Sequence, residues 1–151
     1  MESEESLQAN RGPFLTAAVI CEKVLQERDG VISLIRIIDR LTHTIQAPQM
    51  PAELPKVTFQ FAIFINLKSG SARGRSQLEV VSEQPSGQRK RIFETSMLFE
   101  GEDRGSNLII QTGFEFDAEG LYWFDVALDG HRVTRIPFRM LYQLVSTGTR
   151  G

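Results

Sequence analysis

Large apolar side chains occupy every second position between residues 57 and 67. These positions hold Val57, Phe59, Phe61, Ile63, Ile65 and Leu67. Because successive side chains of an extended chain point to opposite faces, this period of two places them together on one face of a β-strand. Aromatic and β-branched residues also fit the pleated surface of a sheet well. The pattern therefore predicts a long strand with one buried face.

A tight turn is expected at Asp129-Gly130, between the alternating segments 121–128 and 131–138. An Asp-Gly pair accommodates the positive φ angles of a type I′ turn, whose twist matches that of a hairpin. Pro137 cannot donate to a neighbouring strand, so the second segment should end there or lie at a sheet edge. Further short strands are predicted at residues 78–81, 91–99 and 108–116.

Residues 14–28 fit either a helix or a strand. Their apolar side chains recur at helical spacing, and a proline precedes them. As extended chain, residues 15–28 and 31–39 would flank a second Asp-Gly turn. The second segment holds five β-branched residues among its first eight, which favours the hairpin.

Seven or eight short strands separated by turn signals predict an all-β fold, an antiparallel immunoglobulin-like β-sandwich. Residues 46–56 contain three prolines and are expected to form a loop that crosses between the sheets. Gly120 and Tyr122 match the pattern of a sandwich corner, in which a tyrosine hydroxyl bonds a nearby backbone group. With one cysteine in the chain, packing alone must hold the sheets together.

A length of 151 residues with 41% hydrophobic and 24% charged residues is that of one ordinary globular domain. We expect a disordered acidic tail at residues 1–13, a single β-sandwich domain at 14–146 and a flexible tail at 147–151. The formal net charge is −2, and this excess lies in residues 1–12. A neutral domain argues against nucleic-acid binding. Without a secretory signal or a long apolar run, the predicted location is the cytoplasm, with no membrane contact.

Two motifs resemble an uncharacterised bacterial family that carries only a domain-of-unknown-function label. They are Gly30-Val-Ile-Ser-Leu-Ile-Arg-Ile-Ile-Asp39 and Gly120-Leu-Tyr-Trp-Phe-Asp-Val-Ala-Leu-Asp-Gly130. The resemblance spans residues 17–140, and its motifs are turns, a corner and core alternation. It implies an immunoglobulin-like β-sandwich from a bacterial cytoplasm, and it implies no activity, cofactor or catalytic residue.

Few side chains suit catalysis or metal binding. The chain has one cysteine, Cys21, and two histidines, His43 and His131. Cys21 lies in an apolar run, where a free cysteine behaves as a small hydrophobe. The sequence also lacks a nucleophile elbow, a phosphate-binding glycine loop and a calcium-loop spacing. We therefore predict a protein that is not an enzyme and needs no cofactor or metal.

The candidate interaction surface is aromatic. If Tyr122 faces the core, alternation directs Leu121, Trp123 and Asp125 outward, and Phe64 lies on the outer side of its own strand. Exposed aromatic side chains often anchor interfaces, although residues 139–146 are apolar enough to cover these instead.

The functional hypothesis is a non-enzymatic interaction or assembly module. It would bind a protein partner or self-associate through a sheet face or edge. The alternative is a small-ligand or carbohydrate-binding domain that uses Trp123 as a stacking platform. A hydrolase that uses Cys21 is the least favoured hypothesis, since no neighbouring group in the sequence activates the thiol except Lys23.

Overall fold

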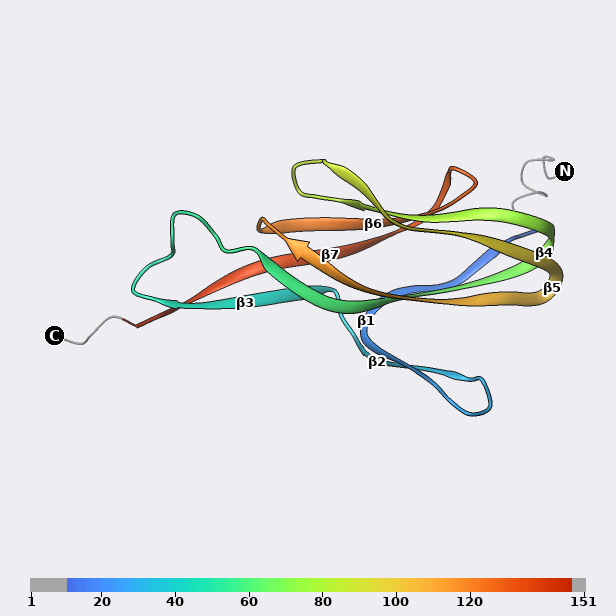
Figure 1. Ribbon diagram of the computed structural model, residues 1–151, viewed down its shortest axis with the longest axis horizontal. Coiled ribbons are helices and arrows are strands. Elements are labelled where there is room, and N and C mark those ends of the chain that lie inside the picture. Colours follow the sequence, from blue (N-terminus) through green and yellow to red (C-terminus); the bar gives the residue numbers. More distant parts are fainter. Residues whose placement is uncertain (1–10, 148–151) are drawn as a thin grey trace, which may run out of the picture.

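The computed structural model describes residues 11–147 of the chain. Within that range, seven β-strands make up the regular secondary structure (Figure 1). They are β1 (Phe14–Gln26), β2 (Ile32–Ile37), β3 (Arg40–Ala47), β4 (Val57–Glu83), β5 (Arg89–Phe116), β6 (Gly120–Leu128) and β7 (His131–Ser146). The all-β prediction is confirmed. None of the described residues forms a helix long and apolar enough to cross a membrane.

The two predicted tails fall largely on residues 1–10 and 148–151, which lie outside the described range. At the described N-terminal end, the chain is bonded to the domain. The carbonyl oxygen of Arg11 accepts hydrogen bonds from the backbone N–H of Ser71 at 2.6 Å and from its hydroxyl at 2.8 Å. Residue 11 is therefore held by hydrogen bonds to residue 71, in the middle of β4.

All seven strands belong to one sheet that curls into a half-barrel. The strand order is β2-β1-β4-β6-β7-β3, and β5 pairs with β4 beside this path. β4 and β5 are 27 and 28 residues long, and both turn back on themselves (Figure 1). The first arm of the sheet comprises β1, β2, residues 57–68 of β4 and residues 105–116 of β5. The second arm comprises β3, β6, β7, residues 73–83 of β4 and residues 89–100 of β5.

Glycines in both long strands make the bend between the arms. Gly70 of β4 and Gly101 of β5 have φ angles of +60° and +93°, a region that favours glycine. A Cβ atom at Gly105 would collide with the backbone carbonyl of Leu67. The strands predicted at 57–67 and 78–81 are thus one bent strand, as are those at 91–99 and 108–116, because the glycines bend the chain without ending the pairing.

The prediction of an antiparallel immunoglobulin-like sandwich is correct for the all-β class and the number of strands, but not for the strand arrangement. β3 pairs with β7 in the parallel direction, so the sheet is mixed. The two strands are separated in the chain by β4, β5 and β6, so no short hairpin requires them to be antiparallel. A single curled sheet also replaces two separate sheets, because β4 and β5 run through both arms.

Residues 14–28 are a strand followed by a turn, since β1 and β2 pair as an antiparallel hairpin. This confirms the favoured interpretation. β7 continues past Pro137 to Ser146, so the strand does not end at the proline. β3 joins β7 only from Arg139 onward, so at Pro137 the described strand partner of β7 is β6 alone.

An aromatic core fills the space between the two arms. Phe61 of the first arm lies 5.7 Å from Phe124 and 6.0 Å from Phe138 of the second arm, measured between ring centroids. Phe114 and Phe116 of β5 lie 4.8 Å apart and complete this cluster. Offset and edge-to-face aromatic pairs add to the stabilisation that comes from burial alone. Packing therefore holds the arms together without a disulfide, and the one cysteine is a buried free thiol.

Tyr122 is fully buried at the start of β6, and its hydroxyl is bonded in both directions. It donates to the carbonyl oxygen of Ala118 at 2.8 Å and accepts from the Ala118 N–H at 3.1 Å. Gly120, between them, has a φ of +139° and lies against Pro85. Burial raises the pKa of Tyr122, so the hydroxyl keeps its proton at neutral pH. This arrangement fixes the entry of the chain into β6.

Replacing Tyr122 by phenylalanine is expected to lower the free energy of unfolding by about 1–2 kcal/mol, because it leaves both backbone groups of Ala118 without this partner. Urea denaturation followed by circular dichroism measures the change. Tyr142→Phe is a comparison, since its hydroxyl makes a single bond, to the carbonyl of Pro55. A smaller loss at Tyr122 than at Tyr142 would contradict a corner role.

Candidate functional site

Trp123 lies on the outer face of β6, between Glu83 of β4 and Pro137 of β7 in the neighbouring strands. Its ring is half-buried, and the guanidinium carbon of Arg135 lies 4.5 Å from the ring centroid. Arginine and tryptophan in contact attract each other through a cation–π interaction. Leu121, two residues earlier on the same face, is also half-buried and lies opposite Arg139. The aromatic ring is thus already partly covered.

Phe64 faces outward on the first arm, so the structure does not bring it together with Trp123. Only 7% of its surface is exposed. Val19 of β1 and Ile109 of β5 lie opposite it in the adjacent strands, so their side chains flank the ring. Phe64 alone therefore offers little contact area, contrary to what its position on the strand predicts.

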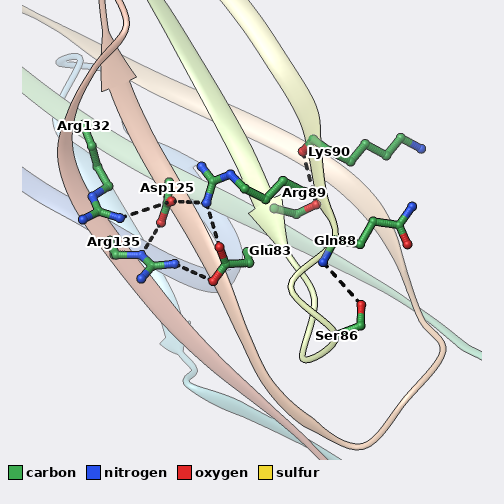
Figure 2. Close-up of polar contacts among 9 residues, drawn as sticks. Glu83, Ser86, Gln88, Arg89, Lys90, Asp125, Arg132 and Arg135 are labelled. Atoms are coloured by element: carbon green, nitrogen blue, oxygen red, sulfur yellow. Dashed lines mark hydrogen bonds and ion pairs between the residues drawn. The ribbon is translucent and has the colours of Figure 1, made fainter.

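A network of charged side chains surrounds Asp125 on the outer face of the second arm (Figure 2). Arg135 donates from Nε to Asp125 at 2.7 Å, and Arg89 donates to the other carboxylate oxygen at 2.9 Å. Arg132 lies 3.6 Å from the same oxygen. Glu83 accepts from Arg89 at 2.9 Å and from Arg135 at 2.8 Å. The side chains come from β4, β5, β6 and β7, so the network ties four strands together.

Asp125 is 2% exposed although alternation directs it outward. It does point to the outer face, but the arginine side chains cover it. Burial alone would raise the pKa of the Asp125 carboxyl. Hydrogen bonds from Arg135 and Arg89 outweigh this effect, so the pKa lies below its ordinary value. The same two arginines lower the pKa of Glu83. Both carboxylates are therefore charged at neutral pH.

The network is better suited to holding strands than to chemistry. Its carboxylates already accept hydrogen bonds from arginines, which leaves neither as a free general base. Among the described residues, no group of three or more His, Cys, Asp or Glu side chains is arranged to hold a metal ion. Burial raises the pKa of Cys21, so its thiol is protonated at neutral pH. His43 packs edge-on against Tyr142, with 5.9 Å between ring centroids.

The β1–β2 hairpin projects from the body of the half-barrel (Figure 1). β1 pairs with β4 only as far as Cys21, whereas its pairing with β2 runs from Cys21 to Gln26. Residues 23–26 and 32–35 therefore form a two-stranded ribbon without a third strand beside it in the described structure. Such ribbons are at best marginally stable in water on their own.

Apolar side chains cover both faces of this ribbon. Strand register places Leu25 and Ile35, with Ile37 at the base of the ribbon, on one face and Val24, Ile32 and Leu34 on the other. Ile35 is 38% exposed and Ile37 62% exposed. None of the six belongs to the core cluster or packs against it. The sequence carried a signal of this surface, because six of the eight residues at 31–38 are apolar without strict alternation, which is typical of a strand covered on both faces.

The sequence comparisons identify one family. Residues 16–141 match a family of unknown function (DUF6941). A search of curated proteins finds no match. The family description names no activity, ligand or fold, so the functional argument depends on the surfaces described above.

Proposed function

The chain belongs to the family of unknown function DUF6941, since the match covers most of its length, and for this member we propose a non-enzymatic assembly role. The protein would self-associate through its β1–β2 hairpin, which is a sheet edge. The observation that carries the proposal is a two-stranded ribbon with apolar side chains on both faces, against which no other part of the described residues 11–147 forms a layer.

Hydrophobic burial supports an association at the hairpin. Full burial of an exposed large aliphatic side chain contributes about 1.5–3 kcal/mol. Ile35 and Ile37 are exposed and the other four side chains are half-buried, so the two isoleucines have the most area left to bury. A strand of the partner copy would also add backbone hydrogen bonds along the free edge of β2, whose described strand partner is β1 alone. Unpaired strand edges readily accept another strand. Association would thus stabilise the part of the fold that lacks support.

The charges of the hairpin favour a second copy of the same chain as the partner. Its charged residues comprise three of each sign: Glu22, Lys23, Glu27, Arg28, Asp29 and Arg36. Glu22 and Arg36 already form an ion pair at 2.8 Å. A surface with no net charge does not repel its own copy, and a two-fold axis brings the same patch of both copies together. A nucleic acid or an anionic membrane would need an excess of positive charge, so neither is part of the proposal.

The double variant Ile35→Lys/Ile37→Lys is expected to raise the dissociation constant of the dimer by about a hundredfold, because two exposed isoleucines at the centre of the interface are replaced by charges. Sedimentation velocity over a range of micromolar concentrations measures it. Wild-type protein should shift from monomer to dimer with concentration, and the variant should remain monomeric.

Leu98→Lys is the matched control, since Leu98 is 46% exposed on β5 and lies outside the hairpin. It should dimerise as the wild type does. A wild-type protein that stays monomeric throughout, or a hairpin variant that dimerises unchanged, would exclude self-association through β1 and β2.

The carbohydrate-binding alternative is less favoured by the geometry at Trp123. Arg135 lies over the indole ring and is held there by Asp125 and Glu83. A sugar ring that stacks on this face must first displace an arginine with two carboxylate partners. The assembly role requires no such rearrangement.

A further inference from the structure

A cleft of about 480 Å³ opens where the two ends of β5 face each other. One wall contains Lys90 and Ile92 from the beginning of β5, and the other contains Thr112 and Phe114 from its end. Asp117, just after β5, also lines the cleft. The cleft is thus the open side of the half-barrel, where neither arm continues into a further strand.

Both walls present strand edges rather than closed sheet. In the described structure β5 pairs with β4 alone, so the opposite side of β5 has no strand partner over either half. Gly113 lines the cleft without a side chain, so the main chain itself borders the space. An unpaired edge offers a row of N–H donors and C=O acceptors to an added strand.

Some charged side chains of the cleft already form ion pairs with their neighbours, and others do not. Arg91 forms an ion pair with Glu94 at 2.8 Å. Lys90 leads away from the charged network (Figure 2), and no described carboxylate forms an ion pair with it. The Tyr122 hydroxyl lies 3.4 Å from the Asp117 carboxylate, but its proton is directed to the nearer Ala118 carbonyl at 2.8 Å. Glu115 also lines the cleft and lies 3.5 Å from Lys56. Among the described residues, Lys90 and Asp117 are therefore the charged groups of the cleft that have no ion pair.

An apolar floor lies between these charges. Phe114 is 8% exposed at the cleft, and its ring rests 5.2 Å from Phe124 of the core, measured between centroids. Ile92 on the opposite wall is half-buried and packs against the core cluster. An apolar side chain placed here would extend the core outward, as a strand residue does in a closed barrel.

We infer that this cleft binds an extended peptide segment of a partner protein, which adds to β5 as a further strand. Main-chain hydrogen bonds to the β5 edge would supply affinity, and the side chains that alternate inward would supply specificity. The segment would place an apolar residue over Phe114, an acidic residue near Lys90 and a basic residue near Asp117. This site is separate from the hairpin and does not depend on self-association.

The test selects ligands for the full-length protein from a phage-displayed library of random ten-residue peptides. Selected peptides should share an apolar position flanked by acidic and basic ones. A synthetic copy of one binder is then N-methylated at one residue at a time, with affinity measured by isothermal titration calorimetry. Methylation of the amides that bond the β5 edge should weaken binding about tenfold or more, while methylation of the alternate amides should not.

Protein variants locate the bound peptide. Lys90→Glu should weaken binding about tenfold, because an attraction becomes a repulsion at an exposed residue that forms no ion pair within residues 11–147. Arg75→Glu makes the same charge change at an exposed position of β4 beside the bend and should bind as the wild type does. The hairpin variant Ile35→Lys/Ile37→Lys should also bind normally. Failure to select any peptide, binding that tolerates Lys90→Glu, or indifference to N-methylation at every position would overturn the inference.

Discussion

Replacing Phe61 by alanine is expected to lower the free energy of unfolding by about 3–5 kcal/mol. Phe61 is 3% exposed and joins the two arms through its contacts with Phe124 and Phe138. Alanine at this position loses the free energy gained by moving the phenyl ring from water into the core, and it leaves a cavity. The cavity cannot easily close, because both walls are strands held in register by their neighbours.

Urea denaturation followed by circular dichroism measures this loss, at one fixed protein concentration because dimerisation adds to apparent stability. Phe14→Ala is the matched control, since Phe14 is 40% exposed near the start of β1. It should cost less than half as much. Equal losses at the two positions would mean that the contact between the arms is not the main source of stability.

The buried face of the strand at residues 57–67 was predictable because the pattern that indicates it lies within those residues. Alternation over residues 57–67 requires no knowledge of the rest of the fold, and the structure buries Phe61, Ile63, Ile65 and Leu67 as expected. The turn at Asp129-Gly130 was predictable for the same reason, since both residues have positive φ angles that their side chains tolerate. Features set by neighbouring residues were therefore correctly identified.

The continuity of β4 and β5 was not predictable from the same reasoning. Glycines at positions 70, 74, 101 and 105 indicate a loop when each segment is considered alone. In the structure they form a bend in two paired strands, where the register shifts twice and the pairing then resumes. Whether a glycine ends a strand or bends it depends on what lies beside it, which the local sequence does not specify.

The charged network was missed for a similar reason. Its members lie at residues 83, 89, 125, 132 and 135, so their contact depends on the register of several strand pairs. Alternation correctly directs Asp125 outward, but it cannot reveal that arginines from two other strands cover the carboxylate. The unsupported hairpin is a third case, because each strand was expected but the early departure of β1 from β4 was not.

Replacing Asp125 by asparagine is expected to lower the free energy of unfolding by about 2–3 kcal/mol at neutral pH. Asparagine keeps the shape of the side chain but removes the charge that Arg135 and Arg89 contact at 2.7 and 2.9 Å. The arginines are partly exposed and regain some hydration, which keeps the loss below that of a fully buried pair. Asp39→Asn, at a side chain that is 73% exposed, is the control and should change stability by less than about 0.5 kcal/mol.

The same variant should alter the pH dependence of stability. The folded pKa of Asp125 lies below its unfolded value of about 3.9, so its stabilising contribution is present above that pH. The contribution is lost as the pH falls through the lowered folded pKa, when the carboxylate takes up a proton and its ion pairs with the arginines end. Urea midpoints measured from pH 7 to about pH 3 should therefore decline less steeply for Asp125→Asn than for the wild type. Glu83 remains in the variant and loses its own contribution in the same direction, so the slope should decrease without vanishing. Identical slopes for the two proteins would show that the Asp125 carboxylate does not stabilise the fold.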